Sequence, residues 1–273
     1  MSAEGETEDQ AQEVLPDDIF VHFEELFRSK LEANDTNDEI VGYITQQLRD
    51  MESIELSGNN PLKFRMTDEF LQILVDCLLE SDVKIQILTL RHHRLTSGAL
   101  KIISALWSKN VDELCSLSQL DLDGNDVDDT GIESLTSYLL SSDCTLLSLN
   151  LNNNPIQERG GMLLAEALKV NSSVQRLLLH NCNLTLKSLI AVITCISGNS
   201  NSNIGHLDLG RPILNNYKND EICDHISTRL LLSPNCRLQI LELQKCHITD
   251  HGAILLSQAL MQNTTLKSLN LEW

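Results

Sequence analysis

Aromatic residues are scarce in this chain, at 4% of its 273 residues. Hydrophobic residues of all kinds still make up 42% of the sequence, which is enough for one large domain or two small ones. The core must therefore be assembled mostly from aliphatic side chains, leucine above all. Such a core is unusual for an ordinary globular enzyme and natural for a stack in which one small layer recurs.

Basic residues are also few. The 20 Lys and Arg residues face 39 Asp and Glu, and the formal net charge at pH 7 is −19. A surface this negative repels phosphate backbones and anionic lipid headgroups, so neither nucleic acid nor a membrane is expected as a partner. No apolar run approaches the length of a membrane span. A basic protein is the partner that this charge favours.

The eight cysteines lack the paired spacing of a disulfide or metal-binding framework. The N-terminus is acidic and has no apolar stretch that would serve as a secretory signal. We therefore expect eight reduced thiols in a cytosolic or nuclear protein. The combinations His92–His93, His180–Cys182 and Cys246–His247 do not have the ligand spacing of a structural zinc site, and packing is the better interpretation of them.

Catalytic signatures are missing as well. Ser, His and Asp occur without a G-x-S-x-G turn, and the glycines are spread along the chain rather than gathered in a phosphate-binding loop. We expect no enzymatic activity, no metal and no cofactor.

What the sequence does contain is a repeat. Segments that follow the template L-x-x-L-x-L-x-x-N/C-x-L recur with starts 28 to 34 residues apart, and the last is cut off by the end of the chain. The clearest are Leu117–Val127, Leu146–Ile156 and Leu238–Ile248. The eight starts are Met51, Ile85, Leu117, Leu146, Val174, Ile204, Leu238 and Leu266.

Each position of the template has a physical reason. The second and third apolar residues lie two apart on a short strand, so both point into the core. The asparagine position falls at the following turn, where a buried amide can bond free backbone groups of neighbouring turns. Asn59, Asn125 and Asn154 occupy it, and Cys182 and Cys246 replace them in later repeats. Pro212 takes this place in the sixth repeat and predicts a local irregularity.

A glycine and a stretch of helical periodicity follow most templates, as in Gly161–Val170 and Gly252–Gln262. Each repeat is thus predicted to contain a strand, a turn, a helix and a loop that leads back to the next strand. The predicted fold is an α/β solenoid with parallel strands inside the curve and helices outside it. No unit can bury its apolar side alone, so the repeats fold only as a stack.

The two ends of the chain differ from the middle. Residues 1–16 predict an acidic disordered tail, residues 17–50 a helical N-terminal cap, and residues 51–273 seven repeats plus a truncated eighth. Residues 266–273 stop inside a strand. We expect either that the natural chain is longer or that a partner covers this edge.

The glycine-then-helix unit resembles the ribonuclease-inhibitor class of leucine-rich repeats over most of residues 51–273. The resemblance implies a horseshoe-shaped solenoid and an intracellular binding protein without enzymatic activity. It also implies a location in the cytoplasm and nucleus, with the nucleolus as one option.

Three tripeptides match the N-glycosylation pattern and begin at Asn171, Asn183 and Asn263. Two of them lie just before a strand. We interpret these as helix-exit turns in which asparagine adopts the left-handed conformation, because no secretory signal accompanies them.

The strand residues that point into the concavity form two rows, here called the first and second floor rows. Four members of the first row are acidic and none is basic, so the curved floor should concentrate a negative potential. The first row is Glu55, Thr89, Asp121, Asn150, Leu178, Asp208, Glu242 and Asn270. The second is Ser57, Arg91, Asp123, Asn152, His180, Gly210, Gln244 and Glu272.

The main hypothesis is a protein-binding scaffold that takes a basic protein on this floor. The residues expected to contact it are Glu55, Arg91, Asp121, Asp123, Asn150, Asn152, His180, Asp208 and Glu242. One alternative is an activating-type regulator of a small GTPase, since Ran GTPase-activating proteins also have ribonuclease-inhibitor-type repeats. Arg94 or Arg159 would then be the working residue. A second alternative is an inhibitor of a cationic ribonuclease.

Overall fold

The computed structural model describes residues 53–58, 65–80, 85–108, 117–213 and 220–272. The acidic tail of residues 1–16 and the helical cap of residues 17–50 lie outside these residues, and both stay predictions.

Eight strands form one parallel sheet in which each strand pairs with the next along the chain, and this confirms the predicted strand order. Most of the strands have only three residues, because the chain leaves the sheet at a tight turn directly afterwards. Their bounds are β1 Ser53–Ser57, β2 Ile87–Arg91, β3 Gln119–Asp121, β4 Ser148–Asn150, β5 Arg176–Leu178, β6 His206–Asp208, β7 Ile240–Glu242 and β8 Ser268–Asn270.

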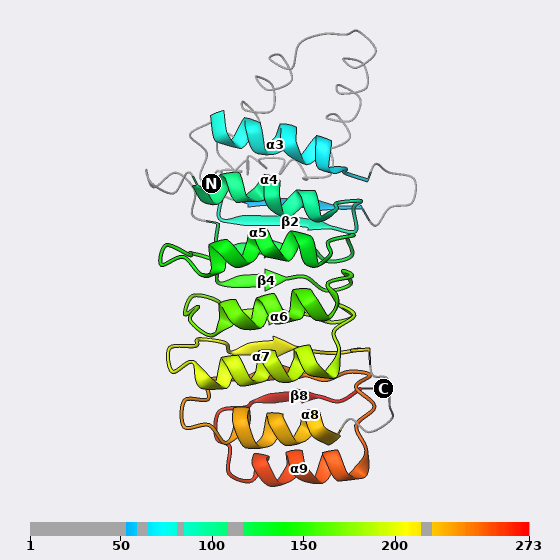
Figure 1. Ribbon diagram of the computed structural model, residues 1–273, viewed down its shortest axis with the longest axis vertical. Helices are drawn as coiled ribbons and strands as arrows, with labels where there is room; N and C mark the ends of the chain where they lie inside the picture. The colour runs from blue at the N-terminus through cyan, green and yellow to red at the C-terminus, as the bar shows by residue number, and fades with distance from the viewer. Residues whose placement is uncertain (1–52, 59–64, 81–84, 109–116, 214–219, 273) are drawn as a thin grey trace, which may run out of the picture.

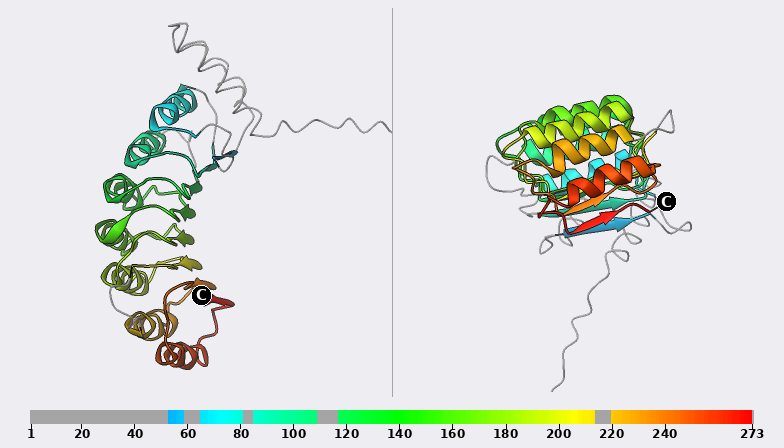
Figure 2. Two further views of the ribbon diagram at one scale, coloured as in Figure 1. Left: turned by 90° about the vertical axis from the view of Figure 1, so that its right-hand side faces the viewer. Right: turned by 90° about the horizontal axis from the view of Figure 1, so that it is seen from below.

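The helices form a second layer beside the sheet, and the stack curves with its strands on the inner side (Figures 1 and 2). The predicted α/β solenoid is thus confirmed. None of the helices in the described ranges is long and apolar enough to span a membrane. The helix bounds are α3 Asp68–Glu80, α4 Ser97–Ser108, α5 Asp129–Leu139, α6 Gln157–Leu168, α7 Leu186–Gly198, α8 Asp220–His225, η2 Ile226–Leu231 and α9 Asp250–Leu260.

The core on the sheet side is a row of aliphatic residues, mostly leucine, that occupy the same position on successive strands. Leu120, Leu149 and Leu177 lie in register on three neighbouring strands, and each is at most 1% exposed. Leu151, just after β4, is fully buried as well. The predicted inward phase of the two template leucines is therefore confirmed.

The predicted asparagine ladder is present at the strand-to-helix turns. The amide of Asn125 donates to the carbonyls of Leu90 and Leu122 at 2.8 and 2.9 Å. Asn154 repeats this one layer further, and its Oδ1 accepts the N–H of Val127 at 3.0 Å. Each amide thus joins two repeats by satisfying backbone groups of both. Asn59 lies outside the described residues.

Other side chains take the same place where asparagine is missing. The Cys182 thiol donates to the carbonyl of Leu151 at 3.0 Å, and Cys246 lies 3.6 Å from the carbonyl of Leu209. Burial raises the pKa of the Cys246 thiol to about 12, so it stays protonated. The second repeat uses His93, which is 4% exposed and accepts the N–H of Met66 at 3.2 Å.

The sixth repeat is irregular in its helix rather than at Pro212. The turn keeps the general pattern, since Arg211 is left-handed and donates its N–H to the carbonyl of Gln244 at 2.7 Å. The helix that follows begins as α8 and then widens into the π-helix η2.

A second asparagine ladder joins the helix exits. The amides of Asn171, Asn199 and Asn263 donate to carbonyls in the preceding repeat, those of Leu139, Leu168 and Leu231, at 2.8 to 2.9 Å. The left-handed conformation predicted for Asn171 and Asn263 is wrong, because their side chains rather than their backbones close the turn. Asn183 alone of the three tripeptide asparagines is left-handed, at φ 55°.

The cysteines of the described ranges, Cys77, Cys144, Cys182, Cys195, Cys223, Cys236 and Cys246, are all free. Cys115 lies outside those ranges.

Truncation of one leucine in this core row of aliphatic residues tests the packing. Leu149→Ala should lower the free energy of unfolding by roughly 2–5 kcal/mol, the usual cost of removing a fully buried leucine side chain. Urea unfolding followed by circular dichroism measures it. Leu147→Ala is the matched control, because Leu147 is 41% exposed and should cost far less. Equal losses at both positions would contradict the inward assignment.

The buried ladder histidine makes stability depend on pH. Burial lowers the pKa of His93 to about 4, so the folded chain holds this ring neutral while the unfolded chain protonates it below about pH 6.5. Stability is then complete above pH 6.5 and falls as the pH drops toward 4. The loss at pH 5 should be about 2 kcal/mol relative to pH 7.

His93→Asn isolates this contribution, since asparagine fills the same place in two other repeats and does not titrate. The variant should lose about 2 kcal/mol less than the wild type between pH 7 and pH 5 in urea unfolding. Parallel pH profiles for the two proteins would show that His93 is protonated in the folded state.

Candidate binding surface on the strand face

The first floor row exists as predicted. Its eight members lie in register from Glu55 on β1 to Asn270 on β8, through every strand pair of the sheet. The second floor row begins within β1 and β2, at Ser57 and Arg91, and lies just beyond the strands from β3 onward. Backbone hydrogen bonds between repeats hold the row in line. In these bonds the N–H of the residue after each member reaches the carbonyl of the next member, as from Asn153 to His180 at 2.8 Å.

From Arg91 to Gln244, the residue that follows each member of the second row has a left-handed backbone. This conformation turns the chain out of the sheet and is costly for residues other than glycine, although Asn and His tolerate it better than most. These left-handed residues form a third row, which lines the border of the floor with side chains of varied chemistry. Its members are His92, Gly124, Asn153, Asn181, Arg211 and Lys245, with φ between 52° and 68°.

The floor is less exposed than its sequence pattern predicted. Asn150, Leu178 and Asp208 in the first row are only 5–7% exposed, and Gly210 in the second row is also buried. The expectation that all floor positions are open was wrong for these four. The three buried side chains lie on the neighbouring strands β4, β5 and β6, so it is the central part of the first row that is covered.

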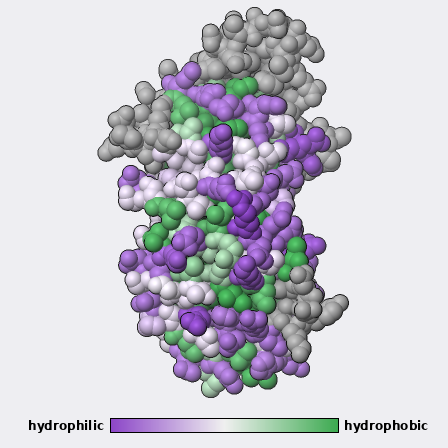
Figure 3. Space-filling view, in the orientation of Figure 1, coloured by the Kyte–Doolittle hydropathy of each residue, from purple (hydrophilic) through white to green (hydrophobic). Residues whose placement is uncertain are grey.

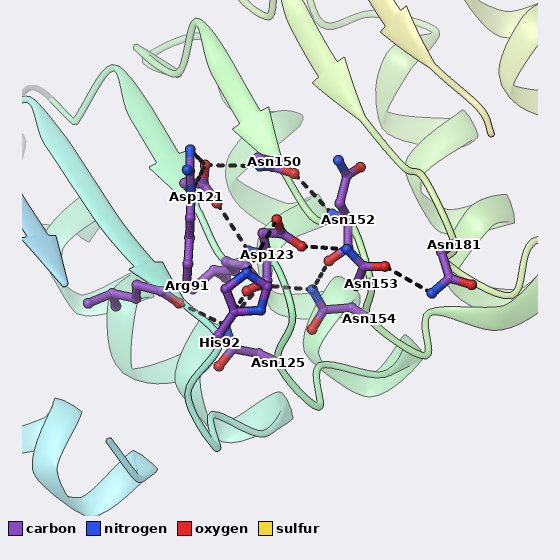
Figure 4. Close-up of polar contacts among 12 residues, drawn as sticks. Arg91, His92, Asp121, Asp123, Asn125, Asn150, Asn152, Asn153, Asn154 and Asn181 are labelled. Atoms are coloured by element: carbon purple, nitrogen blue, oxygen red, sulfur yellow. Dashed lines mark hydrogen bonds and ion pairs between the residues drawn. The ribbon is translucent and has the colours of Figure 1, made fainter. Parts of the chain in front are cut away.

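Arg91 and Asp121 form the main polar contact in the N-terminal half of the floor (Figure 4). Nε and Nη2 of Arg91 donate to Oδ2 of Asp121 at 2.9 and 2.6 Å. The amide of Asn150 donates to the same oxygen at 2.9 Å. The Asp121 charge is therefore already balanced within the protein, and it contributes little to an attractive potential.

The second row continues this network toward the turn (Figure 4). Asn153 donates to Oδ1 of Asp123 at 2.7 Å, and Nε2 of His92 lies 3.9 Å from the other oxygen. Oδ1 of Asn152 accepts the backbone N–H of His180 at 2.7 Å. Asn152 thus orients the next repeat's histidine and is held in place itself.

Two histidines and two acids gather in the C-terminal half. Nε2 of His206 lies 2.7 Å from Oε1 of Glu242, and Nδ1 of His180 lies 3.7 Å from Oδ1 of Asp208. Burial raises the pKa of the Asp208 carboxyl, and the N–H of Gly210, 2.9 Å from Oδ1, acts in the opposite direction. Three of the residues that were predicted to bind a partner are thus neighbours, since His180 lies beside Asp208 and Asp208 is in register with Glu242.

His92 and His206 were missed by the sequence interpretation. His206 is the first residue of β6 and precedes Asp208 by two positions, so strand alternation alone places it on the floor. His92 was noticed only as a possible metal ligand. No group of three or more His, Cys, Asp and Glu in the described ranges is arranged to hold a metal ion.

The arginines of the GTPase hypothesis lie off the floor. Arg159 is on α6 and pairs with Asp129 and Glu133 of the neighbouring helix α5. Arg94 follows β2 and is exposed. The helix side shows separate apolar patches between polar side chains rather than one continuous apolar surface (Figure 3).

The parallel sheet, the outer helices and the side-chain ladders at the turns define the fold of this chain as a leucine-rich-repeat solenoid. The family described as "Leucine Rich repeat" matches residues 113–135, 142–165 and 235–257.

Among curated proteins, the chain is 31% identical to NACHT, LRR and PYD domains-containing protein 5 of Homo sapiens over 189 residues, which are 64% of this chain and 15% of that protein. It is 27% identical to NACHT, LRR and PYD domains-containing protein 3 of Rattus norvegicus over 247 residues, with 80% and 22% covered. The chain thus spans less than a quarter of the length of these relatives. The solved structure of Leiomodin-1 Actin-Binding Site 2 superimposes with a TM-score of 0.43 at 17% identity, and covers 60% of this chain and 90% of its own.

Proposed function

We propose that this chain is a non-enzymatic protein-binding scaffold whose strand face takes a basic protein or a basic segment of one. The observation that carries the proposal is the register of the floor rows. They bring Glu55, Asp123, Asp208 and Glu242 to the inner side of one curved sheet without a lysine among them. Arg91 is the single permanent cation of the two rows, and Asp121 neutralises it.

The repeat architecture supports this use, because solenoids present extended concave surfaces and bind partners there. Two halves of the floor then differ in role. The N-terminal half is internally paired through Arg91, whereas the C-terminal half carries Asp208 and Glu242 with histidines as their nearest basic groups. A cationic partner gains most from the C-terminal half.

The GTPase-regulator hypothesis receives less support. A catalytic arginine must reach a nucleotide of the partner, and Arg159 is occupied by two carboxylates on the helix side. Literal ribonuclease inhibition remains a special case of the scaffold proposal, since a cationic ribonuclease is a basic protein.

A finer resemblance adds to the proposal. The stretches Ile54–Leu62, Gly160–Ser173 and Leu207–Leu214 are similar to leucine-rich repeat-containing protein 34, with Arg211-Pro212 as the most specific part. We accordingly propose the cytoplasm and nucleus as the places where this chain acts.

Removal of the floor charges tests the proposal. The fourfold variant D121N/D123N/D208N/E242Q should keep its fold, because the new amides retain a hydrogen-bond acceptor at each position. Proteins captured at low salt with the full chain as bait should associate with the variant about tenfold more slowly, as expected when electrostatic steering is lost. Association rates at two salt concentrations measure this, and the salt dependence should flatten for the variant.

The matched control changes four exposed acids on the helix layer, as E69Q/E166Q/E221Q/D224N. It alters the net charge by the same amount, so its association rates separate the effect of the floor from that of total charge. A control that slows association as much as the floor variant, or a floor variant that associates at the wild-type rate, would place the binding surface elsewhere.

A further inference from the structure

Four acids of the floor each face a basic side chain, which is an arginine in one case and a histidine in the other three. Asp121 pairs with Arg91, Asp123 lies near His92, Asp208 near His180, and Glu242 contacts His206. Only the first of these partners is permanently charged. The net charge of these four pairs therefore depends on three histidines.

Two of the histidines, His92 after β2 and His180 after β5, have a similar local arrangement. A Cβ atom on Gly124 would lie 2.2 Å from Nδ1 of His92, and a Cβ atom on Gly210 would lie 2.3 Å from Nδ1 of His180. In both cases the imidazole thus lies over a glycine of the next repeat, which has no side chain to exclude it. The ring is held beside the acid of that repeat, Asp123 or Asp208.

The carboxylate of Asp208 is buried beside His180. Its side chain is only 8% exposed, and within the described ranges its one hydrogen bond comes from the N–H of Gly210 to Oδ1. Nδ1 of His180 is buried there without a hydrogen-bond partner among the same residues. Asp208 and His180 thus form a close pair of a carboxylate and an imidazole whose hydrogen-bonding capacity is only partly used within the described ranges.

The surrounding charged groups are few. His206 has Arg176 in register on β5, Glu242 on β7, and Asp208 two positions along its own strand. His180 faces Asp208 of β6 and Asn152 of the preceding repeat, and His92 adjoins Arg91 and faces Asp123. With neutral histidines, the four paired acids and Arg91 carry three negative charges, and protonation of the three histidines cancels them.

We propose that the strand face is a binding surface for an arginine- or lysine-rich protein segment that holds its ligand at neutral pH and releases it on mild acidification, because His92, His180 and His206 then neutralise Asp123, Asp208 and Glu242. This inference rests on the proposed function of the floor. Histidine is the side chain whose charge changes between about pH 5 and 8, so a small acidification suffices. The protonated rings also occupy the carboxylates that a partner's cations would contact.

An octa-arginine peptide labelled with tetramethylrhodamine is a suitable probe, because neither the guanidinium groups nor the dye changes charge between pH 5.5 and pH 7.5. Fluorescence anisotropy at constant ionic strength gives its dissociation constant with the full chain at pH 7.5 and pH 5.5. The wild type should bind roughly five- to twentyfold more weakly at pH 5.5, as expected for three partly exposed charge pairs. Circular dichroism at both pH values checks that the chain stays folded.

The variant H92Q/H180N/H206Q keeps a neutral polar atom near each acid and cannot be protonated. It should bind the probe within about twofold of the same affinity at both pH values. The matched control H225N/H247Q/H251Q removes three histidines outside the floor and should behave as the wild type does. A histidine-free floor that still weakens with acid would overturn the histidine assignment.

The fourfold acid variant D121N/D123N/D208N/E242Q separates the two proposals. If it binds the probe as the wild type does at pH 7.5, the floor does not bind cations and the proposed function fails. If it binds more weakly while the histidine variant keeps the wild-type response to pH, the floor binds cations and only the pH inference fails.

Discussion

The structure depends on one constraint. The strands are too short for their own hydrogen bonds to satisfy the buried backbone N–H and C=O groups of the turns that follow. A three-residue strand leaves the sheet at a tight turn, and the carbonyls and N–H groups of that turn are buried against the next repeat. Side-chain amides and thiols form hydrogen bonds with these backbone groups. A buried backbone group left without a hydrogen bond would cost about one or more kcal/mol of stability. Asn125 and Asn154 accordingly bond the backbone of two repeats at once. The floor is held in register by this ladder, and the curvature of the stack presents it as one surface.

Most of the fold could be predicted from the sequence, because each of its parts leaves a periodic signal. Leu149 and Leu151 two residues apart predict a strand and its inward side, and Asn154 three residues later predicts the turn. His93 shows where this reasoning ends. It fills an asparagine position without resembling asparagine, and only the contact with Met66 reveals that its ring nitrogen accepts a backbone hydrogen bond. Asn171 and Asn263 show a second limit, since a helix-exit asparagine can close its turn with either its backbone or its side chain.

The sequence predicted which residues lie on the strand face, but it did not predict which of their side chains pair with one another. Alternation places Asp121 and Asp208 on the same side of the sheet, but it does not say that Arg91 reaches across to one of them and that the other is nearly covered. Pairing between repeats depends on side-chain length and on the small residue at Gly210, and these are properties of neighbouring layers rather than of any one segment. A floor judged by its acids alone therefore looks more negative than it is.

The left-handed residues that follow the second floor row have a consequence for how this surface can change. His92, Asn153, Asn181, Arg211 and Lys245 share a backbone conformation that the turn requires, while their side chains range from neutral amides to full cations. Glycine is the least costly replacement at these places, and β-branched residues are the most costly. The rim of the floor can thus vary its chemistry over a wide range while its shape stays constant. Diversification of partners along this edge is limited by the backbone conformation, and at Gly124 also by the ring of His92 packed against it.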